Sequence, residues 1–396
     1  MKRVLYISGS VGLGHVTRDL EIVRQLRSLN PNIEVSWAAD YPASMVVEKA
    51  GERLIPESLK LTECNYLVEE FASNYELNVH DLFTKFSKDF AKNMELVSQI
   101  QEREKYDLIV GDETYDISAQ LAKRPEKKTF PYVMIYDFFG TRRVSKGPKD
   151  ALQAIMIGRT FHGWATHEPP VIDRQIFLGE EEDVDDGPIA SFLPNARDVA
   201  KAHFRFVGYA VGFDPQKYRD QKKAREEIGW KDEPIILVTA GGTMAGKPLL
   251  ELCIRTYPIL KATIPDLKMM VVSGPSIPPE SIKGMEGVEI RGYVPDLFKY
   301  MAAADLVVTS GGGSSMLELT ALNRPFIYFP FERHCEQMFC SERCERHKAG
   351  VKMTYSKTTE EGLAKAILEN IGKEVDYSEI RLDGARNAAA VINELL

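Results

Sequence analysis

Long apolar runs are absent from this sequence, and their absence excludes several classes of protein. Nowhere among the 396 residues do 18 apolar residues stand together, so we expect no transmembrane helix. The apolar stretch 4–8 follows the first three residues at once; it is too short for the core of a secretory signal and fits a β-strand. We therefore expect a cytoplasmic protein. Peripheral contact with a membrane through one amphipathic face stays open.

Positive charge is also in deficit. The formal net charge is −8 and the isoelectric point is near 5.6. Because binding to a nucleic-acid backbone needs a basic surface, we expect no nucleic-acid partner. Hydrophobic residues make up 44% of the chain, which is typical of a globular protein with two cores. The acidic run 180–186 is interpreted as a solvated loop without chemistry.

Cysteine is scarce and irregularly spaced. The five cysteines, Cys64 among them, form no C-x-x-C pair, and an odd count without a disulfide pattern is typical of a reducing compartment. Cys340, Cys344 and His347 would share a helix face, with Cys335 nearby, so a metal site there is an open question. Because the spacing matches no strong zinc pattern, we favour small buried thiols.

Short apolar stretches alternate with segments able to form helices, and this alternation occurs twice. Residues 1–209 hold the first series and residues 233–375 the second, with a linker and a first helix at 210–232. Such alternation predicts parallel sheets covered by helices, hence an α/β protein of two doubly wound, Rossmann-like domains. The predicted strands are residues 4–8, 34–39, 106–112, 132–136, 235–239, 268–273, 288–290, 306–309 and 326–329, and a further strand is expected to end near 163–168.

Residues 61–101 have a different character and are predicted to be mostly helical. An aromatic-rich stripe runs through this region, which is most often core but can also bind an apolar acceptor. The stripe consists of Phe71, Tyr75, Leu82, Phe83, Phe86 and Phe90.

Residues 305–318 carry the clearest sign of function. A predicted buried strand is followed by three glycines and then by a helix that Ser314 and Ser315 open. The free N–H groups of a first helical turn attract anions, and glycine lets a phosphate come close. Glu318 stands three residues after Ser315, so the same letters also fit a capping box, and a structural role of Glu318 stays open.

Two other glycine-rich loops are near matches to nucleotide motifs. The loop 9–15 follows the first strand, but Gly12-x-Gly14-x-x-Thr17 lacks the third glycine of the dinucleotide fingerprint. The loop 241–248 nearly spells a P-loop, but Pro248 stands where the magnesium-binding hydroxyl belongs and fits the first turn of a helix. We therefore favour neither NAD nor ATP as a ligand.

The order of these motifs resembles the nucleotide-sugar motif of two-domain glycosyltransferases. The order is Ser-Gly, Ser315, Glu318, a proline, an apolar strand and then Glu336-Gln337. The likeness is greatest to family 28, the cell-wall UDP-N-acetylglucosaminyl transferases and their relatives, and it extends over the whole chain. It implies the GT-B architecture, in which two Rossmann-like domains face a cleft. It also implies that a C-terminal helix in 376–396 packs back on the first domain.

The resemblance implies a role for each donor-site residue. The start of the helix, with Gly312, Gly313, Ser314 and Ser315, would hold the diphosphate, and Glu318 would bind the ribose hydroxyls. Glu336 and Gln337 would contact the donor sugar. Gly242 and Thr243 would approach the phosphates from the other side, and the backbone at Tyr293 would recognise a uracil edge.

His15 stands just after the N-terminal glycines, where the resemblance implies a catalytic base. Histidine suits this role because its ordinary pKa lies near neutrality. Asp112 ends a predicted strand and is the candidate carboxylate that orients His15. The alternatives are a loop-packing His15 and a helix-capping Asp112.

Together these residues predict an inverting glycosyltransferase of the hexosyltransferase type that moves a sugar from a nucleotide-diphosphate sugar, favouring UDP, to a hydroxyl acceptor. The acceptor would be a lipid, a glycan or a small molecule. Retaining relatives carry a glutamate seven residues before Glu318, where this chain has Gly311. We expect no cofactor and no essential metal. A UDP-N-acetylglucosamine 2-epimerase and a non-catalytic nucleotide-sugar-binding protein are the alternatives.

Overall fold

The computed structural model describes residues 1–9, 12–61 and 68–396. The chain forms two compact units. The first contains Met1–Leu67, Asn78–Gly212 and Arg381–Leu396, and the second contains Val68–Leu77 and Phe213–Ile380. Each unit therefore combines segments that are far apart in the sequence.

The first unit is built on a seven-stranded parallel sheet in the order β3-β2-β1-β6-β7-β8-β9. The central strands are buried along their length, which explains why they appear in the sequence as continuous apolar runs. The strands are β1 (Lys2–Ile7), β2 (Ile33–Ala38), β3 (Arg53–Leu54), β6 (Leu108–Asp112), β7 (Tyr132–Tyr136), β8 (Arg174–Phe177) and β9 (Phe204–Phe206).

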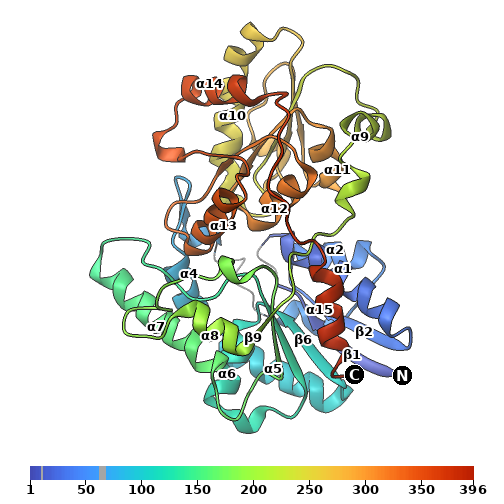
Figure 1. The fold of residues 1–396 in the computed structure, drawn as a ribbon, viewed down its shortest axis with the longest axis vertical. Coiled ribbons are helices and arrows are strands. Elements are labelled where there is room, and N and C mark those ends of the chain that lie inside the picture. Colours follow the sequence, from blue (N-terminus) through green and yellow to red (C-terminus); the bar gives the residue numbers. More distant parts are fainter. Residues whose placement is uncertain (10–11, 62–67) are drawn as a thin grey trace. The chain divides into compact units, whose positions relative to one another are not determined.

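Helices cover this sheet, and the last one comes from the end of the chain. Figure 1 shows α15 in red beside α1 in blue, and the two helices pack together. The strand expected to end near 163–168 is wrong, because α7 extends to Ala165 and a turn follows it. The helices are α1 (Gly14–Leu29), α2 (Ala43–Lys49), α4 (Val79–Phe86), α5 (Phe90–Glu104), α6 (Tyr115–Lys123), α7 (Pro148–Ala165), α8 (Ala196–His203) and α15 (Gly384–Asn393).

The second unit has a six-stranded parallel sheet in the order β12-β11-β10-β13-β14-β15. Its strands are β10 (Ile235–Thr239), β11 (Lys268–Val272), β12 (Val288–Arg291), β13 (Leu306–Ser310), β14 (Phe326–Phe329) and β15 (Val351–Lys352). Its helices are α3 (Val68–Phe71), α9 (Gln221–Ile228), α10 (Lys247–Thr263), α11 (Leu297–Ala303), α12 (Gly313–Leu322), α13 (Cys335–Arg346) and α14 (Glu360–Asn370).

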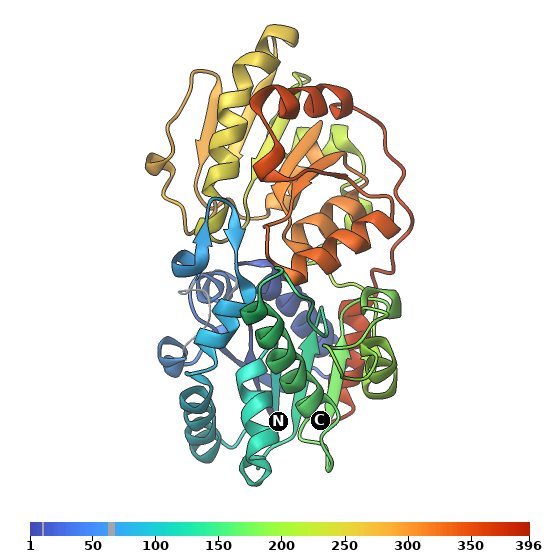
Figure 2. The same cartoon turned by 90° about the vertical axis from the view of Figure 1, so that its left-hand side faces the viewer.

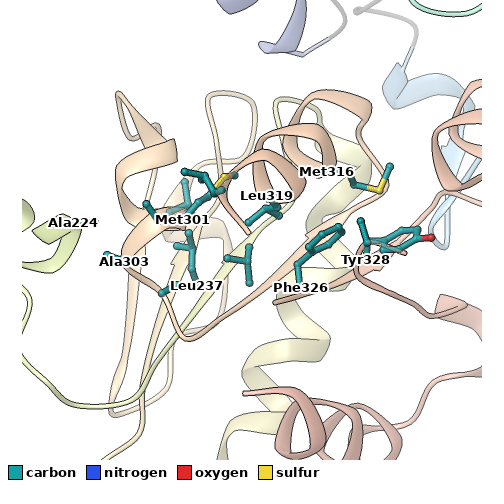
Figure 3. Packing of buried hydrophobic residues seen from close by; sticks show 14 of the residues in the cluster. Ala224, Leu237, Met301, Ala303, Met316, Leu319, Phe326 and Tyr328 are labelled. Atoms are coloured by element: carbon teal, nitrogen blue, oxygen red, sulfur yellow. The ribbon is translucent and has the colours of Figure 1, made fainter. Parts of the chain in front are cut away.

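An apolar cluster fixes α12 on this second sheet (Figure 3). Met316 and Leu319 are completely buried on the inner side of α12. They belong to the same cluster as Leu237 of β10, Met301 and Ala303 of α11, and Phe326 and Tyr328 of β14. This packing holds α12 on the sheet, with its N-terminus at the carboxyl edge.

The strand orders also locate the switch point of each sheet, which is the place where the order of the strands reverses. In the first unit β1 lies between β2 and β6, and in the second β10 lies between β11 and β13. Loops that leave neighbouring strands in opposite directions open a crevice at the carboxyl edge, where open α/β sheets bind ligands. His15, in the first turn of α1, and Asp112, the last residue of β6, flank the first switch point. The loops 240–243 and 311–315 flank the second.

The described residues of the region 61–101 are mostly helical, as predicted, with one exception near its start. Residues 68–77 form α3 and a two-stranded hairpin, β4 (Ala72–Ser73) and β5 (Glu76–Leu77), which belong to the second unit. Tyr75 is therefore not part of a helical stripe. Phe83, Phe86 and Phe90 do pack on one another, and Phe83 also contacts Phe161 in the first unit. Across the described residues, no helix is long and apolar enough to cross a membrane.

Candidate active site

His15 lies in the first turn of α1 and contacts Asp112, the last residue of β6. Its Nδ1 is 3.1 Å from Oδ2 of Asp112, whose side chain is completely buried, whereas the His15 side chain is 12% exposed. Gly9 allows the approach, because a Cβ there would lie 3.3 Å from the backbone oxygen of Asp112 and 3.4 Å from Cγ of His15. The structure thus brings together the two residues predicted for catalysis.

Arg18, which the sequence analysis did not single out, connects this pair to a third carboxylate. It is buried one turn after His15 and donates from Nη2 to Oδ1 of Asp112 at 2.8 Å. Its Nη1 donates to Oδ2 of Asp137 at 2.6 Å. Asp137 directly follows β7, so one guanidinium joins the carboxyl ends of two neighbouring strands.

The charge of Arg18 decides the ionisation of both carboxylates. Burial alone would raise the pKa of Asp112, but the guanidinium of Arg18 and the imidazole of His15 outweigh it and lower the pKa below its ordinary value. Burial likewise opposes ionisation of Asp137, and Arg18 again prevails, so that the pKa of Asp137 is low. The site therefore keeps two buried negative charges beside His15.

Glu113 adds a further acid on the other side of the imidazole. Its Oε2 lies 3.8 Å from Nε2 of His15, and its backbone has a φ of 54°. One ligand atom each of His15, Glu113 and Asp137 lie within 4.8 Å of one another, the single such group in the described part of the chain. Because the Arg18 guanidinium already pairs with Asp137 there, it would repel a cation, and we assign no metal to the group.

The second cluster of predicted residues surrounds the N-terminus of α12. This helix begins at Gly313, so Ser314 and Ser315 lie in its first turn, as expected. Its N-cap residue Gly312 supplies no side-chain acceptor, and a Cβ at Gly312 would meet nothing within 4 Å. The first N–H groups of α12 are thus left for an anion, and the approach past Gly312 is open.

Glu318 does not act as a helix cap. Because Gly312 is the N-cap, the capping-box partner would be at position 315, and Glu318 lies inside the helix one turn later. Glu318 makes no hydrogen bond with any described residue, and burial raises the pKa of its carboxyl to about 7. The capping-box alternative is therefore wrong, and the carboxylate is available to a ligand.

The loop after β10 faces the α12 loop across the switch point. Ser310 Oγ, at the end of β13, donates to the backbone oxygen of Ala240 at 3.1 Å and so ties the two loops. Ser276 Oγ donates to the backbone oxygen of Gly242 at 2.6 Å, and Thr243 is the extended N-cap of the short 3-10 helix Met244–Gly246. Pro248 lies in the first turn of α10, as predicted.

The remaining predicted donor residues lie at the same edge of the second sheet. Gln337 is buried in the first turn of α13, and its Oε1 accepts the backbone N–H of Phe331 at 2.6 Å. Glu336 is its neighbour in that turn, and Tyr293 follows β12. This bond occupies the carbonyl oxygen of the Gln337 side chain and leaves its amide N–H groups outside the bond.

Within the described residues, neither the cysteine cluster nor the acidic run gathers side chains into a comparable site. Cys335, Cys340 and Cys344 are buried thiols outside any disulfide, and none of them joins a group with metal-ligand spacing within the described ranges. Cys64 lies outside the described residues. The acidic run contains one Asp-x-Asp pair, in which Asp183 accepts the backbone N–H of Glu180 and Asp185 accepts from Arg142.

Comparison with known proteins agrees with this fold. Residues 235–392 match the model of the glycosyltransferase family 28 C-terminal domain. An uncharacterized glycosyltransferase of Methanosarcina acetivorans is 34% identical over 364 residues, which covers 90% of this chain and 84% of the relative. The chain therefore belongs to the GT-B glycosyltransferases that carry a family 28 C-terminal domain.

Two more distant likenesses concern parts of the molecule or the fold alone. The UDP-N-acetylglucosamine–N-acetylmuramyl-(pentapeptide) pyrophosphoryl-undecaprenol N-acetylglucosamine transferase of Clostridioides difficile is 26% identical over 157 residues, 38% of each chain. The solved structure of the glycotransferase of kitacinnamycin superposes with a TM-score of 0.60 at 16% identity, covering 99% of this chain and 94% of that one.

Proposed function

We propose that this glycosyltransferase transfers a hexosyl group from a UDP-sugar to an acceptor hydroxyl with inversion at the anomeric carbon and without a metal ion. The observation that carries the proposal is the contact of 3.1 Å between His15 and the buried Asp112, which Arg18 holds ionised. A neutral imidazole oriented by a buried carboxylate is the arrangement of a general base.

The proposed base is Nε2 of His15. In the tautomer with hydrogen on Nδ1, this N–H donates to Asp112, and the lone pair of Nε2 is free to take a proton. Arg18 Nη2, 2.8 Å from Nδ1, then donates to the same carboxylate and not to the imidazole. The acceptor oxygen loses its proton to Nε2 as it bonds to the anomeric carbon, and Asp112 stabilises the imidazolium that forms.

The donor would bind at the second switch point. The open N-terminus of α12 and the hydroxyls of Ser314 and Ser315 would hold the diphosphate, with Thr243 opposite, and Glu318 would accept the ribose hydroxyls. As the bond from the anomeric carbon to the phosphate oxygen breaks, its electron pair stays on the diphosphate. Fixed N–H donors at this oxygen are each worth about 3 kcal/mol in comparable sites.

Inversion is supported by the surroundings of Gly311. A retaining enzyme of this fold would carry a glutamate here, but even a Cβ would lie 2.5 Å from Cα of Pro330 and 2.7 Å from Oε1 of Gln337. This position has no room for a side chain. The choice of UDP is supported by the name of the Clostridioides difficile relative, which matches over 38% of this chain.

The deciding experiment is a calorimetric titration with UDP, UDP-GlcNAc, UDP-Glc, GDP-mannose and dTDP-glucose. We expect saturable binding of one UDP-sugar by the wild type, loss of binding in Glu318→Ala and retention in His15→Ala. Release of UDP with a hydroxyl acceptor should then require His15. If no nucleotide sugar binds, the proposal fails. If His15→Ala keeps full activity, or a free 2-epimer is formed without acceptor, the proposed mechanism fails.

A further inference from the structure

The hairpin of residues 72–77 packs against the segment that leads into the sugar-contacting residues Glu336 and Gln337. Backbone hydrogen bonds run from Leu77 N–H to the oxygen of Glu332 at 3.0 Å and from Glu332 N–H to the oxygen of Tyr75 at 3.3 Å. Figure 2 shows this light-blue hairpin against the rest of the second unit. A short segment from the N-terminal half of the sequence is thus part of the second unit, which holds the proposed donor site.

Tyr75 makes the main side-chain contacts of the hairpin. It is 2% exposed, and its hydroxyl donates to the backbone oxygen of Phe329, the last residue of β14, at 2.8 Å. Its ring centroid lies 4.6 Å from that of Phe331 and 4.6 Å from that of Tyr355. Asn74 and Tyr75 both have positive φ angles, 48° and 67°, a strain that the surrounding contacts must offset.

The chain of contacts continues from Tyr75 to Gln337. Phe331, whose ring packs against that of Tyr75 at an interplanar angle of 49°, donates its backbone N–H to Oε1 of Gln337 at 2.6 Å. This bond fixes the orientation of the Gln337 amide, because only the carbonyl oxygen can accept it. Any shift of Phe331 therefore moves the amide that would contact the donor sugar.

The nucleotide-binding residues meet this chain of contacts at one point, because the backbone N–H of Gly311 also donates to the oxygen of Phe329, at 2.8 Å. Gly312, Ser314, Ser315 and Glu318 belong to the α12 segment, whose inner side packs in the apolar cluster described above. Tyr75 is not a member of that cluster, and its hydroxyl bonds to the end of β14 rather than to α12. Because the Gly311 N–H still holds the Phe329 oxygen when the Tyr75 hydroxyl is removed, a change at Tyr75 is expected to affect the sugar end of the donor more than the nucleotide end.

We propose that Tyr75 is a positioning residue for the donor sugar: through Phe329 and Phe331 it fixes the orientation of Gln337 and so sets the preference for the sugar. This inference rests on the proposed function, since it takes the ligand to be a UDP-sugar. It assigns to the hairpin a role in donor selection. The sequence alone would place Tyr75 in a helix of the acceptor region.

The test compares Tyr75→Phe with Tyr257→Phe. Tyr257 is the matched control because it is also buried in the second unit and its hydroxyl donates to the backbone oxygen of Leu267 at 2.8 Å. We expect Tyr75→Phe to weaken binding of the UDP-sugar five- to tenfold while its affinity for UDP stays within twofold of wild type. Tyr257→Phe should change neither affinity. Equal losses for UDP and UDP-sugar, or no loss for either, would overturn the proposal.

Hydrogen exchange separates this inference from the proposed function. In the ligand-free protein, Tyr75→Phe should speed amide exchange in peptides covering residues 329–337, and Tyr257→Phe should not. If the wild type binds no nucleotide sugar, the proposed function fails, and faster exchange would still support Tyr75 as the residue that orders this segment. If exchange in 329–337 is unchanged in Tyr75→Phe, the positioning role is excluded whatever the ligand.

Discussion

Arg18 donates from one nitrogen, Nη2, to both carboxylate oxygens of Asp112, at 2.8 and 2.9 Å. Two buried, ionised groups in such close contact fix each other in orientation as well as in charge. His15 thus lies beside a carboxylate that cannot rotate away or take up a proton at neutral pH. The base proposed for this enzyme depends on a residue that would not itself touch the acceptor.

Arg18→Lys should keep the charge and lose the fork that binds Asp112 and Asp137 together. We expect kcat/KM to fall about 10- to 100-fold, with little change in the affinity for the UDP-sugar. Steady-state kinetics alongside calorimetry measures both quantities. Arg18→Met should instead destabilise the fold by ~3–5 kcal/mol, because it leaves two buried carboxylates uncompensated. A Lys variant with wild-type kcat/KM would show that the fork has no catalytic role.

Asp112→Asn tests the orientation of the imidazole directly. The amide is nearly isosteric, but it neither stabilises an imidazolium nor favours hydrogen on Nδ1. We expect kcat to drop on the order of 10²–10⁴-fold while the protein still binds the UDP-sugar. His15→Gln serves as the reference for a site without a base. If Asp112→Asn retained most of the activity, Asp112 would be only a structural partner of Arg18.

Much of this fold is predictable because buried parallel strands have a direct signature in sequence. Residues 235–239, 326–329 and 132–136 were predicted as strands with the bounds that β10, β14 and β7 have. The anion-binding turn before α12 is equally visible, since the glycines and the helix start are local features. These are the parts in which neighbouring residues alone determine the structure.

The parts of the fold and of the site that the sequence did not predict depend on contacts between residues far apart in the chain. Arg18 looks like an ordinary surface cation on a helix until β6 and β7 bring Asp112 and Asp137 around it. Its spacing of three residues from His15 on one helix face was the available signal. Tyr75 gave no signal, because the residues that bury it follow more than 250 positions later. The segment 163–168 was misread because Trp164 and Ala165 are buried helix residues.

Glu318 should make donor binding depend on pH. Burial raises the pKa of its carboxyl to about 7 in the free protein, and ribose hydroxyls that donate to the ionised form would lower this pKa in the complex. Below pH 7 the free carboxyl is protonated and must lose its proton on binding. The affinity should therefore weaken as pH falls from 8 to 5, by up to about tenfold per pH unit below 7.

Calorimetry with a UDP-sugar is the suitable measurement, because its diphosphate carries no proton that is lost in this range. In Glu318→Gln the affinity should be weaker at pH 8 and nearly independent of pH. A wild-type affinity that is flat between pH 5 and pH 8 would show that Glu318 does not bind the ribose in its ionised form.

Gly311 and Gly312 are neighbours that differ in the room available for a side chain. Substitutions at the two positions therefore test folding and ligand binding separately. A Cβ at Gly311 would lie 2.5 Å from Cα of Pro330, whereas a Cβ at Gly312 would have no atom within 4 Å. Gly311→Ala should therefore lower the free energy of unfolding by ~1–3 kcal/mol through overpacking. Gly312→Ala should leave this free energy unchanged, because its φ of −66° suits alanine. Thermal or denaturant unfolding measures both effects.

Ligand binding, in contrast, should be impaired in the variant that folds normally, Gly312→Ala. The methyl group of Gly312→Ala would stand in the open approach to the first N–H groups of α12, where the diphosphate is proposed to bind. We expect this folded variant to bind UDP at least tenfold more weakly than the wild type, while its affinity for uridine, which lacks phosphates, stays the same. The added methyl group would keep a phosphate from the backbone of this turn. Unchanged UDP binding by a normally folded Gly312→Ala protein would therefore show that the diphosphate binds elsewhere.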